Sequence, residues 1–177
     1  MKTMLLHVCC GPCSIIAIER LMPIYKIILF FSNSNIYPQD EYKKRLETAK
    51  KVAELYKLEL VEGSYNSQDW FCQVKGYENE PENGKRCDIC VKYRLEKTVE
   101  YAKQHNFNIF ATTLTTGPQK KADKINSIGR SLGETCGIEY FESNFKKKDG
   151  FKKTVELSKE YNLYRQNYCG CKFSIRK

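Results

Sequence analysis

The sequence has 177 residues, with 30 basic and 21 acidic side chains that give a formal net charge of +9. This length suits one domain with a complete hydrophobic core and is short for two, so we expect a single domain over residues 1–177. It contains no stretch of about 18 or more apolar residues, and the amino end lacks the pattern of a signal peptide. We therefore expect no membrane contact and a cytoplasmic location.

Five short apolar runs are typical of strands, and the first two are nearly continuous, as expected of strands covered on both faces. In chain order they occupy residues 4–8, 24–31, 58–61, 109–112 and 138–141. Between and after them, apolar residues at intervals of three or four predict helices. These residues are Leu46, Ala49, Ala53 and Tyr56, then Val91, Leu95, Val99 and Ala102, then Ile125, Ile128 and Leu132, and finally Leu157, Tyr161 and Tyr164. The alternation predicts a three-layer, doubly wound α/β fold with a parallel sheet, followed by an irregular, cysteine-bearing tail.

Two cysteines follow the first predicted strand directly. In doubly wound sheets, ligands bind beyond the carboxyl ends of the strands, often at the turn after the first one. Cys9 and Cys10 lie at this turn, and Pro12 favours the first turn of a following helix. Free amide groups and the positive end of that helix would stabilise thiolates. The spacing of Cys10 and Cys13 also fits a thioredoxin-type dithiol, so a redox pair and a metal site are both open.

The cysteine content indicates metal binding or catalysis. Thiols stay reduced in the cytoplasm, so nine cysteines are not expected to form a disulfide framework. Cys87 and Cys90 open a predicted helix, where their sulfurs can chelate one ion or cluster. Together with the first cysteine group they favour either zinc or an iron–sulfur cluster. Adjacent Cys9 and Cys10 diverge from an extended backbone, which a cluster with several iron corners tolerates better than one zinc ion.

A second kind of cysteine pair lies near the carboxyl end. Cys169 and Cys171 are separated by one glycine, and closing them into a small, strained ring would give an easily reduced disulfide. This suits electron handling, although extra metal ligands and idle thiols are also consistent with the pattern. Cys72 and Cys136 have no second cysteine nearby along the chain, and we assign them no role.

Positive charge is concentrated in residues 120–177, which hold 14 basic and seven acidic residues and so contribute +7 of the net charge. Such a region suits RNA, whose phosphates it neutralises; a solvated basic surface is the alternative. Phenylalanines among the lysines favour RNA, because rings stack on bases. The candidate RNA contacts are Lys120, Lys121, Lys146, Lys147, Lys148, Lys152 and Lys153. Asp149 is a candidate proton donor or ligand, and His7 is more typical of a hydrogen-bonded core residue.

Four motifs together resemble one known family. They are "LLHVCCGPCS" (residues 5–14), "RCDICVKYRL" (86–95), "TTLTTGPQKKADKINSIG" (112–129) and "YRQNYCGCKFS" (164–174). In this order they are similar to the QueH family of epoxyqueuosine reductases, nearly end to end. The resemblance implies a fold similar to the nucleotide-binding sheets of the HUP class. It also implies the last step of queuosine biosynthesis, in which epoxyqueuosine at the wobble position of a tRNA anticodon is reduced to queuosine.

The resemblance further implies which cofactor and which residues form the site. Family members are iron–sulfur enzymes without cobalamin, so we expect a 4Fe-4S cluster and an external electron donor. The cysteines that match the cluster ligands are Cys9, Cys10, Cys87 and Cys90. Cys169 and Cys171 match the terminal pair and are candidate catalytic residues that form a redox-active disulfide. Arg165 and Gln166 match its flanking motif and are further candidate RNA contacts. An additional metal ion, and metal binding by Cys13 or Asp88, are open.

Two other classes of function are also open. A thioredoxin-like thiol–disulfide oxidoreductase would need only Cys10 and Cys13, although the order of helices and strands does not suggest the thioredoxin sheet. A zinc-stapled RNA-binding module would use the same cysteines without catalysis.

Overall fold

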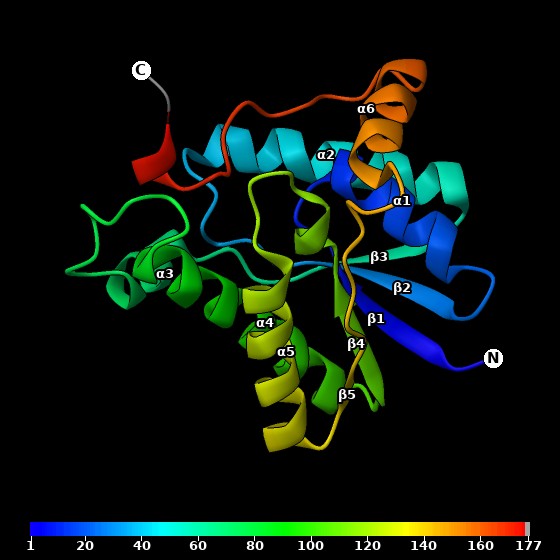
Figure 1. Cartoon of the computed structure of the whole chain (residues 1–177), viewed down its shortest axis with the longest axis horizontal. Coiled ribbons are helices and arrows are strands. Elements are labelled where there is room, and N and C mark those ends of the chain that lie inside the picture. The colour runs from blue at the N-terminus through cyan, green and yellow to red at the C-terminus, as the bar shows by residue number, and fades with distance from the viewer. Residues whose placement is uncertain (176–177) are drawn as a thin grey trace.

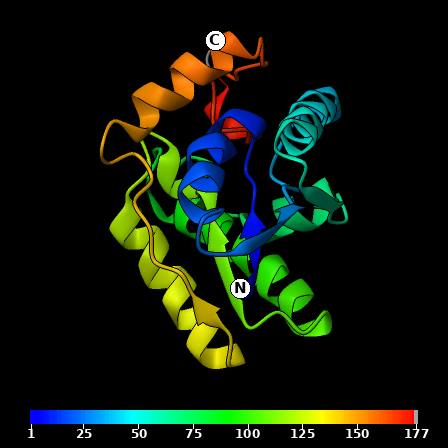
Figure 2. The ribbon, with the colours of Figure 1, turned by 90° about the vertical axis from the view of Figure 1, so that its right-hand side faces the viewer.

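The computed structural model describes residues 1–175 and shows a five-stranded sheet between two layers of helices (Figure 1; Figure 2). The strands are β1 (Thr3–His7), β2 (Lys26–Phe31), β3 (Glu59–Glu62), β4 (Ile109–Thr112) and β5 (Glu139–Tyr140). Their order in the sheet is β3-β2-β1-β4-β5, and every neighbouring pair is parallel. This arrangement confirms the predicted doubly wound parallel sheet, although β2 and β5 are shorter than their apolar runs.

Helices connect the strands. They are α1 (Gly11–Leu21), α2 (Gln39–Tyr56), α3 (Ser67–Gln73), α4 (Lys85–Gln104), α5 (Ala122–Cys136) and α6 (Gly150–Glu160), with short 3-10 turns η1 (Thr113–Thr116) and η2 (Lys172–Ser174). Within residues 1–175, none of these helices has the length and apolar character needed to cross a lipid bilayer.

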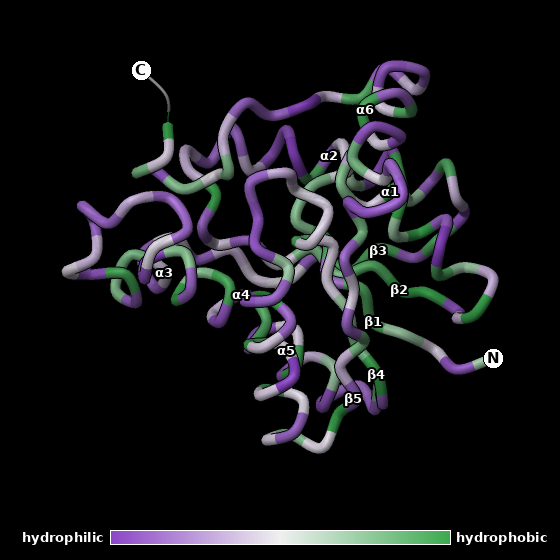
Figure 3. Tube along the Cα trace, viewed as in Figure 1, coloured by the Kyte–Doolittle hydropathy of each residue, from purple (hydrophilic) through white to green (hydrophobic). Residues whose placement is uncertain are grey.

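Each face of the sheet is covered by its own pair of helices. Met4, Leu6 and Leu29 point to the side covered by α1 and α2. Leu5 and Phe110 point to the opposite side, which α4 and α5 cover. Because the central strands are buried on both faces, their sequences are continuously apolar. Figure 3 shows this as green in β2 and β4, whereas the tail that follows α6 is mostly hydrophilic.

The first turn of α1 lies close to α2. Pro12 occupies this turn, as the sequence predicts. Gly11 lies against Thr48 of α2, and a Cβ added at Gly11 would come within 2.7 Å of the Thr48 Cγ2 atom. Glycine therefore permits the close approach that sets the cysteine-bearing turn beside α2.

The last helix is shorter than its apolar spacing predicts. The spacing extends to Tyr164, but α6 ends at Glu160. Asn162 adopts a left-handed φ of 50°, and the amide of Leu163 donates back to the carbonyl of Ser158 at 2.8 Å. This turn and its hydrogen bond end the helix. The tail that follows crosses the carboxyl edge of the sheet.

Candidate metal centre and substrate cavity

Three thiols gather where strand order reverses between β1 and β4, the usual position of a ligand in this fold. The backbone N–H of Cys9 donates to Thr113 Oγ1 at 3.1 Å, and the Thr113 hydroxyl donates to Cys9 Sγ at 3.3 Å. After this turn the sulfur atoms of Cys9, Cys10 and Cys13 all lie within 4.8 Å of one another. The structure therefore brings Cys13, whose role the sequence left open, beside the expected pair.

These three thiols shift one another's pKa values. Hydrogen bonds from Cys10 and Cys13 lower the pKa of Cys9 well below that of an ordinary thiol. Hydrogen bonds to Cys10 and Cys9 raise the pKa of Cys13 in return. Cys9 is thus the thiolate of the group, and the thiolate is the form of cysteine that binds metal.

Four further thiols line a second, small cavity. Cys87 and Cys90 lie about one turn apart at the start of α4, as predicted, and the tail brings Cys169 and Cys171 to the same space. The sulfurs of Cys169 and Cys171 are 4.0 Å apart, and all four cysteines are free thiols. The other described residues that line this cavity are Asn35, Trp70, Arg86, Val91, Arg94 and Lys120.

Arg45 of α2 holds the tail in place. Its Nη1 atom donates to the carbonyl of Cys169 and its Nη2 atom to the carbonyl of Tyr168, each at 3.0 Å. Its Nε atom pairs with Glu41 at 2.8 Å, and the Arg45 side chain is buried. Gly170, between the two cysteines, has a φ of +123°, a conformation that favours glycine. The dithiol is therefore fixed against α2 through its backbone.

Two cations connect the two cysteine groups. Arg94 lies one turn after Cys90, is 4% exposed, and donates to Asn33 Oδ1 from Nε at 3.1 Å and from Nη2 at 2.6 Å. Lys120, like Arg94, lines both the small cavity and a larger one beside it. Burial lowers the pKa of Lys120, but the neighbouring Cys169 and Cys90 thiols outweigh this effect and raise it. Since no carboxylate is among the described residues that line the small cavity, these cations favour thiolates and an anionic occupant.

Unpaired polar atoms indicate that the small cavity is built for a further group. Buried polar side-chain atoms nearly always find a partner. Five of them lack one in the described part of the chain, and three of these belong to the lining of this cavity: Asn35 Oδ1, Trp70 Nε1 and Arg86 Nε. Two of the three are donors, which sulfur acceptors would satisfy. Because soft thiolate ligands select zinc or iron–sulfur clusters, the residues fit a thiolate-bound metal centre.

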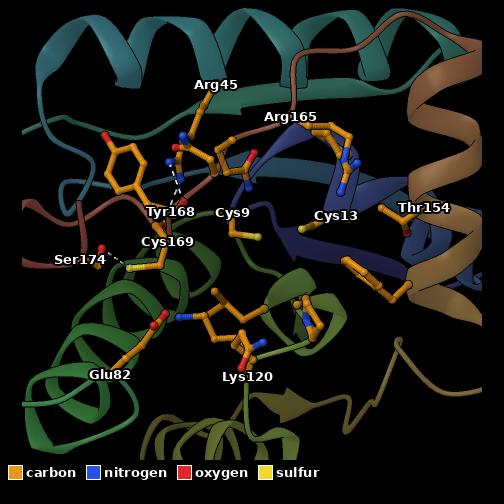
Figure 4. A pocket seen from close by; sticks show the side chains of 18 of the residues that line it. Cys9, Cys13, Arg45, Glu82, Lys120, Thr154, Arg165, Tyr168, Cys169 and Ser174 are labelled. Atoms are coloured by element: carbon orange, nitrogen blue, oxygen red, sulfur yellow. Dashed lines mark hydrogen bonds between the residues drawn. The ribbon is translucent and has the colours of Figure 1, made fainter. Parts of the chain in front are cut away.

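A larger cavity of about 220 Å³ adjoins both cysteine groups (Figure 4). Cys9 and Cys13 lie near its centre, and Cys169 lies at the side where the tail runs. Thr154 of α6 closes the opposite side, and Arg165 approaches from the tail. Thiols and cations therefore line one continuous space that a polar ligand can occupy.

The predicted RNA contacts fall into two groups. Lys120, Arg165 and Gln166 line the larger cavity. Lys146 is half-buried, and its ammonium donates to the carbonyls of Gly117, at 3.4 Å, and of Lys120, so it closes the loop that lines the cavity. The remaining predicted contacts are all exposed: Lys121, Lys147, Lys148, Lys152 and Lys153.

Other candidate residues lie outside the cavities. Asp149 is the exposed N-cap residue of α6, with a left-handed φ of 58°, and it does not line either cavity among the described residues. Asp88 does not line them either and pairs with Lys124 at 3.2 Å. His7 is fully buried and hydrogen-bonded to Thr112 at 2.9 Å, as expected of a core residue. The structure therefore does not bring Asp149 to the thiols.

Sequence reasoning missed three residues of the site. Arg94 follows Cys87 and Cys90 by seven and four positions, so helical spacing alone could have placed it on their face of α4. Arg45 lies 124 residues from the cysteine whose carbonyl it binds. Trp70 lies on a different helix from every cysteine of the cavity. We find no local pattern that would connect either of these two residues to the thiols.

Comparison with known proteins agrees with the motifs. The model of the family described as epoxyqueuosine reductase QueH matches residues 4–177. One relative of that description, from Streptococcus pyogenes serotype M1, is 37% identical over 98% of this chain and 71% of its own length. Another, from Thermotoga maritima, is 39% identical over 99% of this chain and 91% of its own length.

Two solved structures share the fold. One is a predicted subunit of tRNA methyltransferase from Methanocaldococcus jannaschii, with a TM-score of 0.63 at 16% identity, over 90% of this chain and 75% of that one. The other is the U34-tRNA thiolase NcsA from Methanococcus maripaludis with its 4Fe-4S cluster, with a TM-score of 0.61 at 12% identity, over 99% of this chain and 62% of that one. These likenesses confirm the predicted α/β fold.

Proposed function

The chain belongs to the QueH family of epoxyqueuosine reductases, which are oxidoreductases, and we propose that it reduces epoxyqueuosine to queuosine at the wobble position of a tRNA anticodon with a 4Fe-4S cluster and without cobalamin. The observation that carries this proposal is the small cavity, where Cys87 and Cys90 meet the two thiols of the tail, three cations and three unpaired buried polar atoms. Such a lining favours an anionic group with sulfur acceptors over an empty space.

The proposed cluster ligands come from two segments. Cys87 and Cys90 lie in the first two turns of α4 and line the small cavity, whereas Cys9 and Cys10 lie in the turn after β1 and are not among the described residues that line it. Cys9 lines the adjoining larger cavity, and Arg94 and Cys169 line both. Arg94 offsets the negative charge that four thiolates bring into a buried site. When bound, the cluster would pass electrons on one at a time, and if only three of these four cysteines held it, the fourth iron would act as a Lewis acid for the epoxide oxygen.

The dithiol of the tail supplies two electrons in this proposal. A hydrogen bond from the Cys171 thiol lowers the pKa of Cys169, so Cys169 is the thiolate and Cys171 keeps its proton. An S–S bond forms between them as the epoxide becomes an alkene. The oxygen leaves as water, with one proton from Cys171 and one from solvent. An external electron donor then reduces the disulfide, and Asp149, which lies outside the cavities, is not needed as the acid.

The larger cavity is the proposed site of the modified base. The base must leave the stack of the anticodon loop to reach the thiols, as in other enzymes that act on bases. Lys120, Arg165 and Gln166 would contact it or its nearest phosphates, since they line this cavity. The exposed residues Lys121, Lys147, Lys148, Lys152 and Lys153 would bind phosphates further along the RNA.

Anaerobic purification tests the cluster. We expect brown protein with about four irons and four sulfides per chain, the content of a 4Fe-4S cluster. The variant Cys87→Ser should lose iron, and Cys72→Ser, which changes an exposed cysteine, should keep it. Zinc without sulfide would support an RNA-binding module instead, and metal-free protein active in thiol exchange would support the thioredoxin-like alternative.

Turnover tests the reaction. Wild-type protein with a reductant should convert epoxyqueuosine in tRNA to queuosine, measured by mass spectrometry of the released nucleosides. The double variant Cys169→Ser/Cys171→Ser should keep its cluster and lose turnover. Full turnover of this variant with an external reductant would remove the dithiol from the proposal.

A further inference from the structure

The single tryptophan of the sequence has an unusual environment. Trp70 of α3 is 1% exposed, and among the described residues its Nε1–H has no acceptor. It lines the small cavity together with Cys87 and Cys90. Buried indole N–H groups usually have a hydrogen-bond partner. We propose that Trp70 Nε1–H donates a hydrogen bond to the sulfur of Cys90 when the cluster is bound, and that this bond raises the reduction potential of the cluster.

The protein holds the indole beside this cysteine. Asp69, which precedes Trp70, accepts a hydrogen bond from the Tyr93 hydroxyl at 2.7 Å. Tyr93 lies three positions after Cys90 on α4, so this bond ties α3 to α4 next to both residues. The contact between α3 and α4 therefore keeps the Trp70 indole near the Cys90 sulfur.

Aromatic packing prevents the indole from turning away. Its ring lies edge-on to Phe71, with 5.3 Å between centroids, and is stacked with Phe173 of the tail at 6.3 Å. In a close-packed cluster of this kind, rotation of a large ring would require its neighbours to move. The N–H therefore stays on the cavity side of the ring.

The hydrogen bond from Trp70 should raise the reduction potential of the cluster because it stabilises negative charge on the Cys90 sulfur. Burial raises the pKa of Cys90, whereas Arg94 and the nearby Trp70 N–H act in the opposite direction by stabilising its thiolate. A donor that stabilises a thiolate stabilises the more negative, reduced cluster still more. Its loss should make the cluster harder to reduce. This inference rests on the proposed cluster.

Because the sequence has one tryptophan, growth on benzothienylalanine replaces a single N–H by sulfur and leaves the ring shape intact. A second variant, Trp70→Phe, removes the same donor genetically. Phe71→Leu is the matched control, since it alters the same aromatic cluster without changing a donor. The midpoint potential of the cluster is measured by anaerobic titration followed by electron paramagnetic resonance, together with iron and sulfide content.

We expect a lower midpoint potential in the analogue-labelled protein and in Trp70→Phe, and an unchanged one in Phe71→Leu. If Trp70→Phe does not load iron, the midpoint potential of the analogue-labelled protein alone tests the inference. Full cluster content with an unchanged potential in the labelled protein would overturn this inference but not the proposed function. An equal fall in Phe71→Leu would also overturn it, because packing would then be the cause. Wild-type protein without iron or sulfide would contradict both.

Discussion

Arg94 donates two hydrogen bonds to the same oxygen of Asn33, at 3.1 and 2.6 Å, and this bidentate contact holds its guanidinium between the two cysteine groups. Asn33 is itself fixed, because its amide donates to the carbonyl of Val8 at 2.9 Å, one residue before Cys9. The cation of α4 is thereby tied to the turn after β1. The two proposed halves of the cluster site are connected through one buried side chain.

Loss of this cation should weaken metal binding. In Arg94→Gln the thiolates lose a buried positive neighbour, and changes to such supporting residues typically cost about 10- to 100-fold in metal affinity. We expect faster loss of iron to a chelator, measured by absorbance, and partial recovery in Arg94→Lys. The control Lys97→Gln removes a charge from the exposed Lys97–Glu100 contact of the same helix. Equal iron retention in Arg94→Gln and Lys97→Gln would contradict the assigned role.

The buried histidine should make stability depend on pH. Burial lowers the pKa of His7 to about 4 from 6.5. As the pH falls through about 6.5 the unfolded chain binds this proton first, so the free energy of unfolding decreases until about pH 4. From the size of this shift, the loss amounts to about 3 kcal/mol. Urea unfolding of the metal-free protein across this range measures it.

The variant His7→Gln isolates the contribution of the histidine. It should be less stable at neutral pH, because Thr112 and Asn33 lose part of their hydrogen bonding. Its stability should fall less steeply between about pH 6.5 and pH 4, since the titrating group is gone. Parallel curves for the variant and the wild type would show that other groups, such as the Cys9 thiolate, control the acid response.

Removal of the Arg45 side chain should destabilise the fold and release the tail. Arg45→Met leaves Glu41 buried without its cation, a type of change that costs about 3–5 kcal/mol. The carbonyl of Cys169 also loses its donor, so alkylation of the Cys169 thiol should become faster, as measured by mass spectrometry. Lys50→Ala, which breaks the exposed pair with Glu47 at 2.9 Å, should cost less than about 1 kcal/mol.

A double variant tests the cause of that loss. Glu41→Gln/Arg45→Met removes both charges, so part of the stability lost in Arg45→Met should return while the tail stays loose. If the single and double variants are equally unstable, the lost packing and backbone hydrogen bonds of Arg45, rather than the buried charge, account for the effect.

Lysines of α6 should contribute to tRNA binding through phosphates. Neutralising Lys152 and Lys153 to glutamine should weaken binding and reduce the salt dependence of log K by roughly 1.5, since each contacted phosphate contributes about 0.7–0.9. Lys103→Gln is the control, because Lys103 lies in the last turn of α4, toward the opposite edge of the sheet. Filter binding at several salt concentrations measures the slopes. An unchanged slope in the α6 variant would refute this placement of the RNA.

Much of this architecture could be predicted from local sequence. Continuous apolar runs alternate with helical spacing because parallel strands are covered on both faces, and that pattern requires only neighbouring residues. Cys87 and Cys90 lie about one turn apart at the start of a helix for the same reason, since their separation is set within one element. His7 in a buried strand is likewise a core residue with hydrogen-bonded ring nitrogens.

Tertiary structure alone decided how the parts of the site meet. The cysteines of the tail face those of α4 because Arg45 binds backbone carbonyls 124 and 123 residues away. Trp70 reaches the thiols because a hydrogen bond joins α3 to α4, and α6 ends where Asn162 turns into a left-handed conformation. Sequence periodicity describes one element at a time, whereas these contacts join elements whose relative positions follow from the packing of the whole chain.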